Sequence, residues 1–171
     1  DPRSSVAEAF RSLRTGIRHI PFEHVIRTIL VTSPLPLEGK TSVAVGLAAC
    51  LAQEGRQVLL MDCDLRHPSV HEFFDLSNER GLTDVLAARH SLPDCVFPTQ
   101  VSGLKVLPAG QLPPDPAGVL SQIGFSALLE SFRNTYDTVI LDAPPLLSAA
   151  DGQILGKLCD GVLLVVKADA T

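Results

Sequence analysis

The chain has 171 residues, 46% of them hydrophobic, which is enough for one compact domain with a sizeable core. It carries 14 lysines and arginines against 19 aspartates and glutamates, a net charge of −5 at pH 7. A chain of that sign has no electrostatic reason to bind nucleic acid or an anionic lipid surface. Composition therefore disfavours a nucleic-acid partner.

The four cysteines include no Cys-x-x-Cys pair, and most lie within or beside apolar runs that indicate core positions. This usage is typical of a reducing cytosol. Apolar runs such as 161–166 are far shorter than the roughly 20 residues that cross a bilayer, and no leader opens the chain. We therefore expect a soluble, cytoplasmic fragment, whose neighbouring segment could still be membrane-bound.

The first expected element is a helix within residues 1–20 that carries two stripes. At 100° per residue, four apolar side chains fall in a narrow arc that should pack on the domain: Val6, Phe10, Leu13 and Ile17. A charged stripe runs beside it: Glu8, Arg11, Arg14 and Arg18. This second stripe is either a solvated face with a weak ion pair or an interface.

After this helix, β-branched and leucine-rich runs alternate with helical patterns, as they do in βαβ units. The expected strands are 28–32, 57–61, 104–108, 138–142 and 161–166. The expected helices are 41–54, 82–88, 116–123, 125–135 and 149–159. This order predicts a single α/β domain over 1–171, in which helices cover both faces of a doubly wound, mostly parallel sheet.

The segment Ser33–Ser42, SPLPLEGKTS, follows the first strand and ends in Gly-Lys-Thr as a phosphate-binding loop does. Proline stands where that pattern usually has glycine. The later amides of such a loop bind the phosphates, and those of residues 37–41 can all donate. Pro34 and Pro36 lack an N–H but lie at the loop entry, where donors matter less. The segment therefore predicts a nucleotide site.

Three residues of this loop have separate expected roles. Gly39 gives the backbone freedom beside the phosphates, Lys40 reaches the β- and γ-phosphates, and Thr41 offers a hydroxyl to Mg²⁺. We expect Lys40 to be exposed in the loop. A chance Gly-Lys-Thr in a turn is the alternative, but an apolar strand stands just before the loop and an amphipathic helix just after it.

Aspartates follow two more of the expected strands. Asp62 and Asp64 come after the second strand, two residues apart, and Asp142 closes the fourth. Ligands of open α/β sheets bind at this edge. A single aspartate in such a place is often a cap or turn residue, but three that share an edge with the loop favour metal and phosphate chemistry.

These segments resemble, in this order, the motifs of the bacterial tyrosine kinases of capsular and exopolysaccharide synthesis. The matching stretches cover nearly the whole chain: EAFRSLR, SPLPLEGKTS, LLMDCDLRHP, NERGLTDVLA, LKVLPAG and VILDAPP. The resemblance implies a P-loop fold of the ParA and MinD type, unlike that of eukaryotic protein kinases. It also implies an ATP-dependent, autophosphorylating protein tyrosine kinase with ATP and Mg²⁺ as cofactors.

The resemblance implies these residue roles. Nucleotide binding falls to Leu37, Glu38, Gly39, Lys40, Thr41 and Ser42. Phosphoryl transfer falls to Lys40, Asp62 and Asp64, where the two aspartates activate the acceptor tyrosine. The implied magnesium ligands are Thr41, Asp62, Asp64 and Asp142.

The resemblance also implies partners. Glu8, Arg11 and Arg14 match a motif that joins subunits of this family in a ring. A transmembrane activator, the polysaccharide co-polymerase region, is fused to these kinases or is a separate chain. It would hold the domain at the inner face of the cell membrane. The substrate tyrosines lie on a C-terminal tail.

The sequence departs from this family in three ways. Leu37 stands where the family loop usually has glycine, and a positive φ there would cost about 1–2 kcal/mol. Tyr136 is the one tyrosine of the chain, so we expect that the tyrosine-rich tail and the last strands of the family lie outside this sequence. The activator region is also absent. We interpret the chain as a domain fragment.

Two other functions stay open at this stage. A ParA- or MinD-like switch ATPase shares the motif order, but it carries an extra lysine early in the loop, where Leu35 stands here. A nucleotide-binding module without catalysis is kept open by Leu37 and by the absent tyrosines.

Two further features have alternative interpretations. Arg66 either contacts phosphate, braces Asp64 or forms an ordinary salt bridge. Pro144 and Pro145 stiffen the loop after Asp142 or sense the γ-phosphate.

Overall fold

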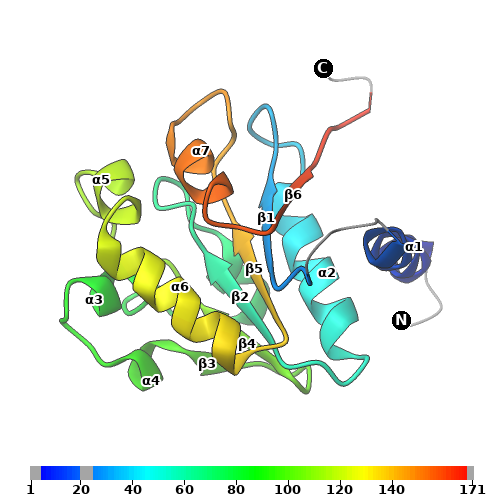
Figure 1. The fold of residues 1–171 in the computed structure, drawn as a ribbon, viewed down its shortest axis with the longest axis horizontal. Coiled ribbons are helices and arrows are strands. Elements are labelled where there is room, and N and C mark those ends of the chain that lie inside the picture. The colour runs from blue at the N-terminus through cyan, green and yellow to red at the C-terminus, as the bar shows by residue number, and fades with distance from the viewer. Residues whose placement is uncertain (1–4, 20–24, 169–171) are drawn as a thin grey trace.

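The computed structural model describes residues 5–19 and 25–168 (Figure 1). Its helices are α1 (Ser5–His19), α2 (Lys40–Ala52), the 3₁₀ helix η1 (Val70–Phe74), α3 (Leu82–Leu86), α4 (Leu92–Cys95), α5 (Pro116–Leu120), α6 (Ile123–Thr135) and α7 (Asp151–Gly156). Its strands are β1 (Thr28–Thr32), β2 (Val58–Asp62), β3 (Phe97–Pro98), β4 (Leu104–Leu107), β5 (Thr138–Asp142) and β6 (Gly161–Leu164).

The strands form one sheet in the order β3-β4-β2-β5-β1-β6. All neighbours are parallel except β3 and β4, which are antiparallel. The predicted doubly wound, mostly parallel sheet is therefore confirmed. Residue Asp62 at the end of β2 lies opposite Asp142 at the end of β5, so the register brings two of the predicted site residues together.

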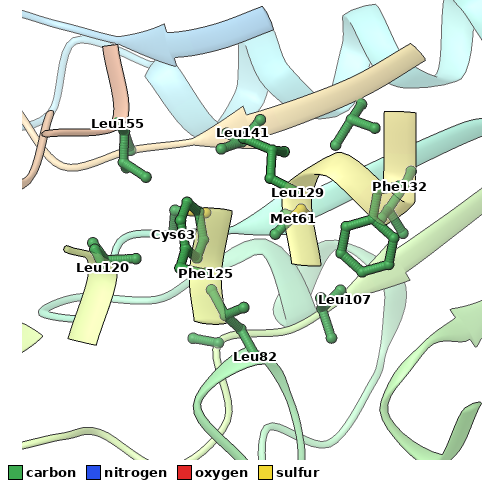
Figure 2. Close-up of a cluster of buried hydrophobic side chains, with 14 of the residues drawn as sticks. Met61, Cys63, Leu82, Leu107, Leu120, Phe125, Leu129, Phe132, Leu141 and Leu155 are labelled. Atoms are coloured by element: carbon green, nitrogen blue, oxygen red, sulfur yellow. The ribbon is translucent and has the colours of Figure 1, made fainter. Parts of the chain in front are cut away.

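One face of the sheet is covered by α3, α5, α6 and α7 (Figure 1). Because side chains alternate along a strand, Met61 and Leu141 both point to this face. They pack with Phe125, Leu129 and Phe132 of α6, as Figure 2 shows. These large side chains make this face the main apolar core.

The opposite face is covered by α2, and α1 lies beyond it, at the right of Figure 1. Small residues of α2 let it approach the strands closely. The ring of Phe10 from α1 lies against Gly46 of α2, where an added Cβ would come within 2.1 Å of the ring. Phe10, Leu13 and Ile17 all pack against this core, as the apolar stripe predicts, but Val6 is 61% exposed.

The charged stripe of α1 is partly used within the chain. Arg11 pairs with Glu8 at 2.6 Å on the same helix. Arg14 pairs with Glu54, just beyond the end of α2, at 2.7 Å. The side chain of Arg18 is outside the described part of the structure. Arg14 therefore helps to attach α1 to its own domain.

The boundaries differ from the expected ones at several elements. The predicted strand 161–166 ends at Leu164, because its one neighbour, β1, ends at the paired residue Thr32. The predicted helices 149–159 and 116–123 shorten to α7 and α5. The short elements η1, α4 and β3 were not predicted, since segments of two to five residues carry little periodicity. Among the described residues, no helix is long and apolar enough to span a bilayer.

Candidate nucleotide and magnesium site

The loop that joins β1 to α2 carries two residues with positive φ. Gly39 has a φ of 88° and Leu37 a φ of 64°. Glycine adopts this region freely, whereas a leucine pays about 1–2 kcal/mol. The Leu37 side chain is also 95% exposed, so apolar packing does not offset that cost. The strain expected at Leu37 is therefore present.

The loop leads directly into the N-terminus of α2. The first N–H groups of any helix lack partners within it and carry a partial positive charge, which favours phosphate. In this structure Glu38 holds the loop entry, because its Oε2 accepts a hydrogen bond from the amide of Leu35 at 2.8 Å. Its Oε1 accepts one from the amide of Lys167 at 3.4 Å. Glu38 therefore ties the loop to the segment after β6.

We expected an exposed Lys40, and this prediction is wrong, because only 12% of its side chain is accessible. The ammonium lies 2.9 Å from Asp64 Oδ2 and 4.0 Å from the carboxylate of Asp142. Burial by itself would lower the pKa of Lys40, but the charges of Asp142 and Asp64 outweigh it and raise the pKa. Lys40 is thus a permanent cation at the centre of the site.

Asp142 lies on the floor of the site, fully buried at the end of β5. Its Oδ2 accepts a hydrogen bond from the hydroxyl of Thr41 at 2.7 Å. Its Oδ1 is buried and has no hydrogen-bond partner within the described residues. Burial raises the pKa of Asp142 to about 6, against the opposing effects of Lys40 and Thr41. A cation beside Oδ1 would satisfy this atom and favour the charged form.

The two aspartates of the second motif occupy different environments. Asp62 is fully buried and accepts hydrogen bonds from the amides of Asp64, Ser69 and Val70, at 3.2, 3.0 and 3.0 Å. Burial, helped by the charge of Asp142, raises the pKa of Asp62 to about 7. Both oxygens of Asp62 therefore hold the segment that follows β2.

Asp64, in contrast, faces a cleft. Its Oδ1 accepts hydrogen bonds from the amides of Arg66 and His67, at 3.3 and 3.0 Å, while Oδ2 meets Lys40. The cleft has a volume of about 740 Å³, which suits a nucleotide. Its lining joins the loop after β1, the segment after β2 and the loop after β5, and includes Leu37, Lys40, Asp64, Arg66, Phe73 and Pro144.

The structure thus brings Lys40 and Thr41 of the loop together with Asp64 and Asp142. Leu37, Gly39 and Ser42 line the same cleft, and Asp62 lies opposite Asp142 in the strand register. Sequence reasoning missed Ser69, whose hydroxyl lies 3.3 Å from that of Thr41. It also missed Asp151 of α7, which pairs with Arg66. No motif indicated either residue, because both depend on how segments distant in sequence meet.

The residues fit magnesium only together with a phosphate ligand. In the part of the chain that the structure describes, no group of three or more His, Cys, Asp or Glu side chains could hold a metal ion. Magnesium in phosphoryl-transfer sites is typically bound by one or two carboxylates and by phosphate oxygens. The hydroxyl of Thr41 and the unpartnered Oδ1 of Asp142 are suitable protein ligands of that kind.

Residues 38–170 match a family model described as an AAA domain. Over all 171 residues the chain is 40% identical to the tyrosine-protein kinase YwqD of Bacillus subtilis, of which it covers 72%. The chain belongs to the bacterial tyrosine-protein kinase family. The resemblance found in the motifs is therefore confirmed.

Solved structures agree with this family. The kinase domain of the Escherichia coli tyrosine kinase ETK matches with a TM-score of 0.95 and 35% identity, over 99% of this chain and 67% of that one. The chimerical protein CapA2B2 matches with a TM-score of 0.96 and 32% identity, over 100% of this chain and 75% of that one. These matches confirm the predicted P-loop fold.

A cell-division relative tests the switch-ATPase alternative. The septum site-determining protein MinD of Pyrococcus horikoshii, complexed with Mg-ADP, matches with a TM-score of 0.69 and 26% identity. It covers 82% of this chain, and this chain covers 57% of it. The TM-score and the sequence identity are both lower than those of the ETK kinase domain, so the kinase family is favoured over the MinD-like alternative.

Proposed function

We propose that this chain is the catalytic domain of an ATP-dependent, autophosphorylating protein tyrosine kinase of capsular or exopolysaccharide synthesis and export. It is a non-specific protein-tyrosine kinase, with ATP and Mg²⁺ as its cofactors. The observation that carries the proposal is the convergence of Lys40, Asp64 and the Thr41–Asp142 pair beside one cleft. The family membership of the chain supports the same activity.

The protein groups have separate tasks in this reaction. Lys40 and the amides at the start of α2 hold the phosphates and orient the γ-phosphoryl group. Magnesium, when bound, neutralises charge on the β- and γ-phosphates. Asp64 is the carboxylate that lines the cleft, so we assign to it the proton of the acceptor tyrosine hydroxyl. Asp62 holds the backbone that carries Asp64.

The partners are part of the proposal. Glu8, Arg11 and Arg14 would join copies of the chain in a ring, and a transmembrane co-polymerase region would activate the domain at the inner face of the membrane. Substrate tyrosines would be supplied by a C-terminal tail. Glu8 is 68% and Arg11 39% exposed in the single chain, which leaves both accessible to a second copy.

Replacing Lys40 with methionine tests the activity. Removing the cation that positions the phosphates should lower phosphate transfer at least about 100-fold. Transfer is measured with labelled ATP, Mg²⁺ and a synthetic Glu-Tyr copolymer as acceptor, and circular dichroism checks the fold. Lys105→Met, at an exposed position of β4, is the matched control. Equal activity in Lys40→Met and Lys105→Met would refute the site.

Replacing Arg11 and Arg14 with alanine tests the ring. We expect a smaller assembly in analytical ultracentrifugation and unchanged ATP binding. Because Arg14 also pairs with Glu54, a Glu54→Gln variant is the control for loss of that internal contact alone. Sedimentation equal to that of the wild type would contradict the interface.

A further inference from the structure

An ion pair joins two segments that border the nucleotide cleft. Arg66, four residues after β2, donates from Nε and Nη2 to the two oxygens of Asp151, at 2.8 and 3.1 Å. Asp151 is the first residue of α7 and is fully buried, whereas the Arg66 side chain is 41% exposed. A fork of this kind fixes both distance and orientation, which a single contact does not.

The backbone of Arg66 is connected to the site. Its amide and that of His67 donate to Asp64 Oδ1, while Asp64 Oδ2 meets Lys40 of the loop after β1. A shift of Arg66 would therefore move the two donors that orient the Asp64 carboxylate. The guanidinium itself is turned to Asp151 and not to Asp64.

The other end of the pair is connected to the same loop. The amide of Leu146, between β5 and α7, donates to the carbonyl oxygen of Ser33 at 2.8 Å, and the hydroxyl of Thr32 donates to the carbonyl oxygen of Pro144 at 2.8 Å. The contacts thus form a closed circuit around the cleft. It runs from the loop to the 143–150 segment, then through Asp151 and Arg66 to Asp64, and returns through Lys40.

We propose that Asp151 is a positioning residue of the kinase: through Arg66 it fixes Asp64 relative to Lys40 and links the segments on the two sides of the cleft. This inference rests on the proposed function for its effect on catalysis. Asp151 acts through Arg66 and does not touch the reacting groups. The Arg66 guanidinium, which lines the cleft, is held on Asp151 in this way.

The chain contains a matched control pair. Arg89 donates from Nε to Oδ1 of the buried Asp84 at 2.9 Å, and its Nη2 lies 2.8 Å from the same oxygen. The two side chains are 45% and 1% exposed. Neither residue lines the nucleotide cleft. Arg66→Lys and Arg89→Lys therefore each replace an arginine that pairs with a buried aspartate at similar exposure, one beside the site and one away from it.

Hydrogen–deuterium exchange on the nucleotide-free protein tests the link without any activity. In Arg66→Lys and in Asp151→Asn, amides of both 64–70 and 143–150 should exchange about 10-fold faster, because either change opens the circuit. Arg89→Lys should leave both segments at wild-type rates. Unchanged exchange in the first two variants overturns the proposal. Asp151→Glu, which keeps the charge but lengthens the side chain, gives the same comparison if Asp151→Asn does not fold.

Kinetics separate positioning from direct contact. For Arg66→Lys and Asp151→Asn we expect kcat for the Glu-Tyr copolymer to fall about 10- to 100-fold, with the Kd for Mg-ADP nearly unchanged. The double variant should be no slower than the slower single variant. A normal kcat in Asp151→Asn with a low kcat in Arg66→Lys would overturn the proposal, because Arg66 would then act by itself. A wild type without transfer even when the proposed activating co-polymerase segment is supplied would refute the kinase function, and the exchange rates would still decide the link.

Discussion

Aspartates lie at both ends of the parallel strands, which we call the carboxyl rim and the amino rim of the sheet. The pKa values of these aspartates shift in opposite directions at the two rims. At the carboxyl rim, burial raises the pKa of Asp62 to about 7 and that of Asp142 to about 6. At the amino rim, burial acts in the same direction on Asp160, but hydrogen bonds from the backbone of Arg27 and Thr28 outweigh it and lower the pKa.

The difference lies in the partners that each rim supplies. Asp160 Oδ2 accepts from the amides of Arg27 and Thr28 at 2.9 and 2.8 Å, and its Oδ1 lies 3.2 Å from Arg133. Asp142 Oδ1 has no partner in the described chain. One rim is therefore complete as folded, whereas the other leaves negative charge that a bound cation would neutralise. A functional rim of this kind is less stable without its ligand.

Among the variants that test this difference between the two rims, Asp142→Asn should have the largest effect. Loss of the charge should reduce phosphate transfer at least about 100-fold, because the amide is a poor ligand for magnesium. The melting temperature of the ligand-free protein should stay equal or rise, because a carboxylate with a raised pKa is costly to keep ionised when folded. Thermal unfolding at pH 7 measures this. A melting temperature far below that of the wild type would contradict the comparison.

Asp160→Asn should have the opposite pattern, with activity retained and stability lost. Breaking hydrogen bonds to a charged acceptor should cost about 1–3 kcal/mol of unfolding free energy. Because the folded pKa of Asp160 is lowered, this stability is present above about pH 4 and is lost as the pH falls through the folded value. Urea unfolding of both proteins between pH 7 and pH 3 should show the difference shrinking. Glu130→Gln, which removes the 62% exposed partner of Arg133, is the control.

The smallest effect concerns the strain at the functional rim. Leu37→Gly removes the cost of a positive φ at an exposed side chain, which the added freedom of glycine in the unfolded chain partly offsets. We expect a gain of up to about 1 kcal/mol in stability and an equal or tighter Kd for Mg-ADP. Calorimetry measures both. Ala88, at φ 52°, is a second non-glycine residue in this region, so Ala88→Gly is the control for strain away from the cleft. Weaker nucleotide binding in Leu37→Gly would show that the leucine itself contributes to the site.

The fold was largely predictable from the sequence, because strands buried on both faces of a parallel sheet are continuous apolar runs in the sequence. The strands 28–32 and 138–142 were placed at their observed ends. Where a boundary depends on a neighbour, prediction was less accurate: β6 is shorter than its apolar run, since β1 ends beside it. The packing of the first helix on the domain was predicted, but its placement on α2, through the contact of Phe10 with Gly46, was not.

For the site, local sequence determined the chemistry of the loop and of the strand-end aspartates, because each motif lies within about ten residues of chain. Tertiary structure decided their relations. It buried Lys40 between Asp64 and Asp142, and it placed the Asp62 carboxylate against the backbone amide of Asp64. It also joined Arg66 to Asp151 across 85 residues of sequence. Such contacts arise only when parallel strands end at one edge of the sheet, so no spacing in the chain records them.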